Sequence, residues 1–292
     1  MKRTLLLLLL QISAIVCFAD EYKDPVTNVI YTYDPAGDRA EVKQGGVFYD
    51  YSGELYPISY PGSPDAKAEI VILDRFIADG KEYIVDRIGN YAFTEMNNVA
   101  SVVIPSSVKS IGKEAFCGCI SLSNVTLAEG LRSIEKSAFV DCAFTTVSLP
   151  ETLEEIGAWA FYLCTKLESI SIPANVTNIG ALSFECCYEL LTITSFIEQP
   201  FEVDDICDAS LQEQITLYVP AGTKSQYEAT SGWQNFRTIE EIQPTGITSP
   251  IPSPKSCFYD LQGRKIGSGK SVPLKGVMGS GIYIEGGKKK VK

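Results

Sequence analysis

The chain has 292 residues, a formal net charge of −11 and no histidine. Without histidine, Ser-His-Asp and Cys-His nucleophile pairs and imidazole metal ligands are excluded. The charge is uneven, because residues 255–292 carry nine Lys/Arg against two Asp/Glu and leave an acidic body before them. Since such a body repels phosphates, nucleic acid is not expected as its partner.

Residues 1–19 have the pattern of a secretory signal peptide. Lys2 and Arg3 are followed by an apolar run over 4–16 and by Cys17-Phe18-Ala19 as a cleavage site. Lipid attachment at Cys17 is the alternative, but Val16 stands where a lipoprotein signal needs a small residue. No later apolar run is long enough to span a membrane, so we expect an extracellular or cell-surface location.

Residues 20–81 are predicted to form an N-terminal β cap. Two alternating segments, residues 29–33 and 40–43, flank a Pro-Ala-Gly-Asp turn at 35–38 and indicate a hairpin. Residues 70–73 and 83–85 are further strand candidates. A cap is expected here because the first unit of a repeat array otherwise exposes its apolar end.

Residues 82–199 contain about five repeats of 22–23 residues, each built on Ile-Gly-x-x-Ala-Phe. The repeated aromatic residues are Phe93, Phe116, Phe139, Phe161 and Phe184. A fixed period of this length predicts a solenoid whose units stack their Phe side chains into one core. A period-two segment follows each Phe and predicts a short strand, and the Ile-Gly-x-x-Ala-Phe segment is expected to return as a short helical turn. The predicted fold class is therefore an α+β repeat solenoid with a parallel sheet on one face.

Three segments follow the repeats. Residues 200–243 are predicted to form a C-terminal capping repeat, with a strand over 215–219 and Thr223 as the N-cap of a helix. Residues 244–255 are a Pro-rich linker. Residues 256–292 are expected to form a small β module.

The repeats resemble the BspA-type leucine-rich repeats of bacterial surface proteins. The phrase Ile-Pro-x-x-Val-x-x-Ile-Gly-x-x-Ala-Phe-x-x-Cys runs from Ile104 to Cys119 and again, with Ser183 in place of Ala, from Ile172 to Cys187. Glu135 likewise departs from it in place of Gly. The resemblance implies a leucine-rich-repeat fold and a secreted or surface-exposed, non-enzymatic protein that binds host or neighbouring-cell macromolecules.

The last 37 residues separately resemble the C-terminal sorting modules of Bacteroidetes secretion. Tyr259-Asp260-Leu261-Gln262-Gly263 and Gly281-Ile282-Tyr283-Ile284 carry this resemblance. It implies a sorting or anchoring role for residues 256–292.

A cysteine lies three residues after the Phe in four of the five repeats. These residues are Cys119, Cys142, Cys164 and Cys187. Disulfides are the alternative in an exported chain, but parallel side chains in a ladder keep their Cβ atoms too far apart for a bridge. Four thiolates in a line do not surround a zinc ion either. We therefore expect small buried apolar side chains here.

The outward positions of the predicted strands carry hydroxyl and amide side chains. The candidate partner-binding residues are Ser101, Asn124, Thr126, Thr146, Ser148, Ser169, Ser171, Thr192, Thr194 and Tyr218. We name this set the hydroxyl stripe. Ser and Thr also suit an exposed sheet without any function, and an ice-binding surface is a further alternative. The functional interpretation is a docking face for a protein or a glycan.

No enzyme, cofactor or metal is expected. The acid pairs Glu154-Glu155 and Asp204-Asp205 are weak candidates for glycoside hydrolysis, because neighbouring residues of a strand point to opposite faces. The sequence predicts a monomeric secreted or surface binding protein that acts in protein–protein interaction or adhesion. The alternative is an envelope- or polysaccharide-binding structural protein.

Overall fold

The computed structural model describes residues 20–24, 29–44, 48–49, 55–56, 68–243, 257–259, 265–268, 282–285 and 288–291. The chain divides into two compact units, residues 1–242 and 243–292. The signal peptide predicted at 1–19 and the linker predicted at 244–255 lie outside the described residues, and the division of the chain into domains stays a prediction.

The first unit begins with an antiparallel layer. Strands β1 (Asp20–Lys23), β2 (Ile30–Tyr33) and β3 (Arg39–Gln44) pair in order, which confirms the predicted hairpin. Strand β3 then pairs in parallel with β8 (Lys81–Ile88), and β7 (Arg75–Ala78) pairs antiparallel with β8. The short strands β4 (Phe48–Tyr49) and β5 (Leu55–Tyr56) pair with each other. An aromatic cluster that includes the stacked pair Tyr22 and Phe76, 4.4 Å apart, fills this end.

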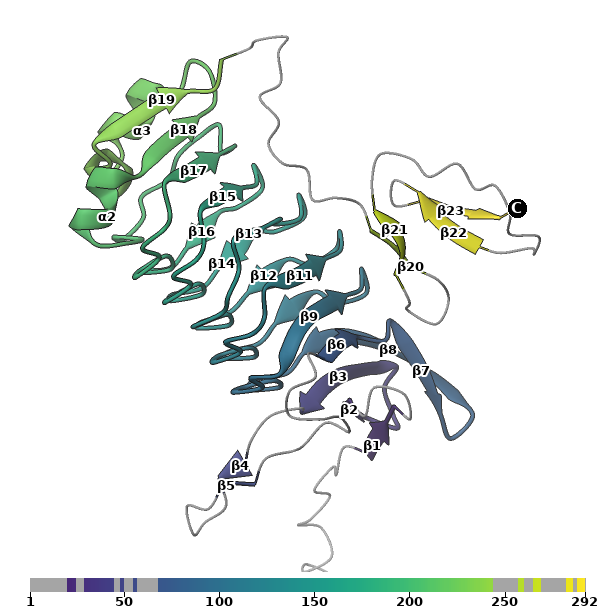
Figure 1. Ribbon diagram of the computed structural model, residues 1–292. Helices are drawn as coiled ribbons and strands as arrows, with labels where there is room; N and C mark the ends of the chain where they lie inside the picture. The colour runs from purple at the N-terminus through teal and green to yellow at the C-terminus, as the bar shows by residue number, and fades with distance from the viewer. Residues whose placement is uncertain are drawn as a thin grey trace, which may run out of the picture. The chain divides into compact units, whose positions relative to one another are not determined.

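Two parallel sheet faces run along the coils of the solenoid (Figure 1). The short-strand face continues from β8 through β10 (Ser110–Ile111), β12 (Ser133–Ile134), β14 (Glu155–Ile156) and β16 (Asn178–Ile179). The second residue of each of these short strands is a buried isoleucine. This face is an addition to the single parallel sheet that the sequence predicts.

The long-strand face consists of two parallel sheets. The first joins β6 (Ala68–Val71), β9 (Val99–Ile104) and β11 (Asn124–Leu127), and the second joins β13 (Thr146–Val147), β15 (Ser169–Ile172), β17 (Thr192–Ser195), β18 (Thr216–Val219) and β19 (Thr238–Glu241). Strand pairing stops between β11 and β13, where one coil is a residue shorter. Only Ala143 separates Cys142 from Phe144, whereas two residues separate Cys119 from Leu122.

The third side of the coils, which we name the turn edge, comprises residues 89–97, 112–120, 135–143, 157–165 and 180–188. It is formed by turns and not by the short helical turns expected from the sequence, so the described chain is mostly strand and the α+β class is not confirmed. The residues two before and two after each Phe have positive φ, as at Trp159 (57°) and Leu163 (60°). Because a right-handed helix needs negative φ throughout, this alternation prevents one. It also directs alternate N–H groups to the next coil, as from Phe161 to the Ser183 carbonyl at 2.8 Å.

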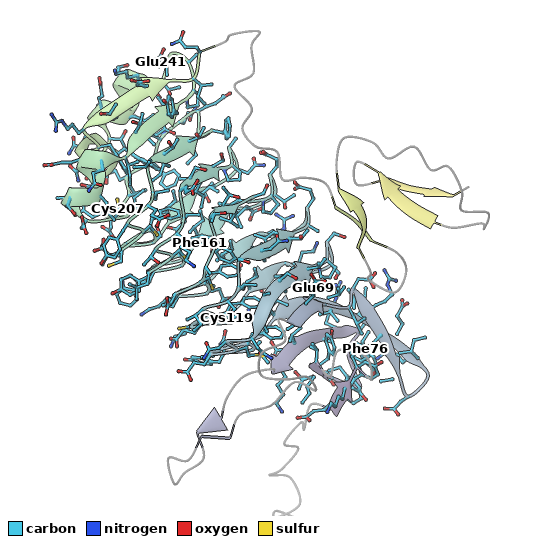
Figure 2. All side chains as sticks on the ribbon, viewed as in Figure 1. Glu69, Phe76, Cys119, Phe161, Cys207 and Glu241 are labelled. Atoms are coloured by element: carbon cyan, nitrogen blue, oxygen red, sulfur yellow. The ribbon has the colours of Figure 1, made fainter. Side chains whose placement is uncertain are left out.

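The predicted Phe ladder is confirmed. All five rings are fully buried, and consecutive rings stack with centroids 4.9–5.6 Å apart and planes within 14° of parallel. Phe144 takes a place that is leucine in neighbouring coils and meets Phe139 edge-on at 5.5 Å. A larger side chain therefore fills the coil that lacks a residue. Figure 2 labels Phe161 in the middle of the stack of coils.

Helices appear only at the C-terminal end of the solenoid among the described residues. They are α2 (Ala209–Gln214), α3 (Lys224–Ala229) and the 3-10 turn η1 (Trp233–Asn235). Thr223 occupies the predicted N-cap of α3, but its hydroxyl donates to the Pro220 carbonyl instead of capping the helix. Trp233 is fully buried and donates to the Phe201 carbonyl at 3.0 Å.

The second unit contains two antiparallel pairs. Strand β20 (Cys257–Tyr259) pairs with β21 (Lys265–Ser268), and β22 (Ile282–Glu285) pairs with β23 (Lys288–Val291). The sorting role inferred for residues 256–292 stays a prediction. Among the described residues, no helix is long and apolar enough to span a membrane.

Candidate docking surface

The long-strand face aligns most of the hydroxyl stripe in two rows. Parallel pairing places Thr146 opposite Ser169, Ser169 opposite Thr192, and Thr192 opposite Thr216. In the second row, Ser171 is opposite Thr194 and Thr194 is opposite Tyr218. Ser148 follows β13 directly and is exposed. Since parallel strands repeat about every 4.8 Å, each row places one hydroxyl per coil at nearly constant spacing.

The N-terminal part of the stripe belongs to the other sheet. Asn124 is opposite Ser101, and Thr126 is opposite Val103. The short coil separates these residues from the Thr146 row, although Ala143 N still donates to the Leu122 carbonyl at 2.9 Å across the junction. The structure therefore brings the ten predicted residues to one face but divides them between two sheets.

The inward positions confirm the predicted alternation. Val102, Ile104, Val125, Val147, Leu149, Ile170, Ile172 and Ile193 are all buried, and Leu127 is partly buried against the core. The stripe residues on the opposite face are exposed or half-exposed. Burial of one face fixes the register, because a slip of one residue would move the aliphatic side chains into solvent.

Carboxylates bound the neutral stripe at both ends. Glu69 of β6 is opposite Ser101, and Glu240 of β19 is opposite Tyr218. Strand β19 also adds Thr238, opposite Thr216, to the first row. Thr238 is not among the residues predicted from the sequence, although Ile239 follows Leu217 by one repeat length and marks the same inward position.

The cysteine ladder is buried, as expected, but its thiols also form hydrogen bonds. Each thiol donates to the carbonyl of the Phe one coil earlier, with S–O distances of 3.0–3.3 Å. Burial raises the pKa of the Cys119 and Cys164 thiols to about 12, which keeps them protonated and able to donate. The seven cysteines with described side chains are free thiols. These side chains therefore link neighbouring coils and are not only apolar filling.

Each of the two acid pairs contains one carboxylate that already binds another side chain of the protein. Glu154 pairs with Arg132 on the short-strand face, while Glu155 is exposed beside it in β14. Asp205 accepts hydrogen bonds from Asn235 at 2.9 Å and from Gln212 at 3.4 Å. Within the described part of the chain, no group of three or more His, Cys, Asp or Glu residues is placed to hold a metal ion.

Residues 86–214 match the family model of the BspA type leucine rich repeat region in six copies. Together with the coils and their parallel sheets, this match defines the described body as a leucine-rich-repeat β-solenoid.

Two solved structures are similar to the chain over most of its length. The Treponema pallidum leucine rich repeat protein TpLRR is 23% identical, with 75% of this chain and 82% of that chain covered and a TM-score of 0.50. A leucine-rich repeat protein from Bacteroides ovatus is 20% identical, with 70% and 57% covered and a TM-score of 0.51. At this identity they establish the fold alone. No match is found among curated proteins.

Proposed function

We propose that this chain is an exported, surface-associated, monomeric binding protein that engages another protein through the hydroxyl stripe. The observation that carries the proposal is the register of the long-strand face. It places neutral hydroxyl side chains in two straight rows on a chain whose body is otherwise strongly acidic.

The chemistry of these rows supports docking and not catalysis. Each hydroxyl both donates and accepts a hydrogen bond, so a row can pair with backbone or side-chain groups of a partner. Ser and Thr also lose little side-chain entropy when they are buried in an interface. The predicted signal peptide and the leucine-rich-repeat fold support a role in adhesion outside the cell.

The stripe is rich in hydroxyl groups and poor in aromatic rings, which favours a protein over a polysaccharide partner. Tyr218 is its only aromatic member. A glycan array separates these two partners, since an envelope- or polysaccharide-binding protein retains specific glycans and a protein-binding one does not.

The proposal is tested by capture on immobilised host extracellular-matrix proteins. Changing Thr146, Ser148, Ser169 and Ser171 to Lys is expected to reduce capture at least tenfold, because four ammonium groups then crowd the rows. The matched control changes four polar residues of the short-strand face, Ser110, Ser133, Thr177 and Asn178, to Lys. Equal capture of both variants would rule out the hydroxyl stripe as the docking site.

A further inference from the structure

A groove with a volume of about 580 Å³ runs along the turn edge across four coils. Glu114 belongs to the first of these coils and Glu185 to the last. The other lining residues are Cys117, Ser137, Val140, Trp159, Tyr162 and Leu182, most of them apolar or aromatic. In Figure 2 the labelled Cys119 and Cys207 lie along the same edge. This surface is distinct from the hydroxyl stripe.

Exposed large hydrophobic side chains gather on this edge. Six such side chains are exposed among the described residues, and four of them, Tyr91, Ile120, Trp159 and Tyr188, belong to the turn edge. Tyr188 is 61% exposed and Trp159 is 38% exposed. Trp159 is the member of this set that lines the groove, where it lies with Val140, Tyr162 and Leu182. A contiguous exposed apolar patch of this kind indicates a binding surface.

Two aromatic side chains of this edge already contact ammonium groups of the chain itself. Lys136 Nζ lies 4.4 Å from the centre of the Trp159 ring, and Lys113 Nζ donates a hydrogen bond to the Tyr91 hydroxyl at 2.8 Å. Both lysines occupy the position three before the repeat Phe. In the next two coils this position is Ala158 and Ala181. The coils that carry Tyr162 and Leu182 therefore have no lysine at this position.

The residues that line the groove include two glutamates and neither lysine nor arginine, although Lys113 beside the groove pairs with Glu114 at 3.3 Å. At the Glu185 end, Oε2 is buried without a hydrogen-bond partner. Burial raises the pKa of Glu185, and the neighbouring charge of Asp208 raises it further. A carboxylate in this position lacks a cation that an incoming ligand can supply.

The dimensions of the groove match a short extended peptide. Glu114 and Glu185 belong to the coils of Phe116 and Phe184, which are three ring spacings of 5.2–5.6 Å apart, or about 16 Å. An extended peptide rises about 3.4 Å per residue and its alternate side chains face the same side, so two residues four positions apart are about 14 Å apart. The long side chains of Lys or Arg can cover the remaining distance to the two carboxylates.

We propose that the turn-edge groove binds an extended protein segment with basic residues four positions apart and an apolar residue midway between them. One basic side chain pairs with Glu185, and the other pairs with Glu114 in place of Lys113. The apolar side chain packs against Trp159, Tyr162 and Leu182.

The test is fluorescence anisotropy of a labelled peptide, Lys-Ser-Leu-Ser-Lys, titrated with the full chain. Saturable binding is expected, with at least tenfold weaker binding of Glu-Ser-Leu-Ser-Glu and of Lys-Ser-Ser-Ser-Lys. The double variant Glu114→Gln/Glu185→Gln is expected to weaken binding of the first peptide at least tenfold. A matched double variant on the long-strand face, Glu168→Gln/Glu240→Gln, removes the same charge and is expected to change it less than twofold.

A second variant is expected to change the peptide affinity in the opposite direction. Lys136→Gln removes the ammonium that covers the Trp159 ring, so binding is expected to tighten roughly threefold. Misfolding does not tighten binding, which makes this result independent of any damage in the double variant. Absence of binding, unchanged binding by the groove variant, or binding of spermidine as tight as that of the peptide would each overturn the proposal. Spermidine binding as tight as peptide binding would mean that the groove is a general cation site.

Discussion

The thiol of Cys164 donates a hydrogen bond to the carbonyl oxygen of Phe139, 3.2 Å away and one coil earlier in the chain. The same link recurs between the other ladder cysteines and the Phe residues that precede them by one coil. The cysteine ladder and the Phe ladder therefore form one structure: the rings stack, and the thiols pair with the backbone that carries them.

Replacing Cys164 with alanine tests this link. We expect Cys164→Ala to lower the free energy of unfolding by about 1–2 kcal/mol, because a buried hydrogen bond is lost and a small cavity forms. Cys164→Ser retains a donor and is expected to cost less. Urea denaturation of both variants measures the difference, and equal losses would show that the thiol acts only by filling space.

Ser183 gives a prediction of stabilisation. It takes the place that is alanine in the other four coils, and its fully buried hydroxyl has no hydrogen-bond partner among the described residues. Since an unsatisfied buried hydroxyl costs about 1–3 kcal/mol, Ser183→Ala is expected to raise the free energy of unfolding by about 1 kcal/mol. Thermal and urea unfolding check this. A less stable variant would mean that the hydroxyl is paired.

The left-handed backbone positions of the turn edge predict that two substitutions change stability in different directions. Gly118 has φ of 73°, and Asp141 holds the equivalent position in the next coil with φ of 56°. Gly118→Ala is expected to destabilise the chain by about 1 kcal/mol, because a Cβ disfavours this conformation. Asp141→Gly removes the same penalty and is expected to be neutral to stabilising. Urea unfolding that reverses this order would contradict the described turns.

Glu185 predicts a pH dependence. Burial and the charge of Asp208 raise its pKa in the folded chain. A raised folded pKa means that the contribution of Glu185 to stability is present below its unfolded pKa and is lost as pH rises through the folded pKa.

The Glu185→Gln variant does not lose stability in this way as pH rises, because glutamine does not ionise. The variant is therefore expected to be more stable than the original chain at pH 7, and the difference is expected to shrink near pH 4, where the carboxyl of Glu185 is largely protonated in both states. Urea titrations at the two pH values measure it. A difference that grows toward low pH would contradict the assignment.

The repeat period predicts the core and the long-strand face because both depend on apolar residues at fixed spacing. The same period predicts neither the turn edge nor the groove. Trp159 and Leu182 adopt positive φ without being Gly or Asn, since hydrogen bonds between coils hold the backbone there and local preference does not. The groove joins side chains that are 22–23 residues apart and becomes visible only when the coils are stacked. The short-strand face gives no alternating pattern in the sequence because its strands β10, β12, β14 and β16 are two residues long.

Site-specific photo-cross-linking tests most directly whether the long-strand face is the docking surface. A photoreactive phenylalanine analogue replaces Ser171 in β15 or, as the matched control, Glu155 in β14, and each chain is irradiated on immobilised host extracellular-matrix proteins. We expect a covalent adduct from position 171 and none from position 155. Adducts from position 155 alone, or in equal yield from both, would contradict the account.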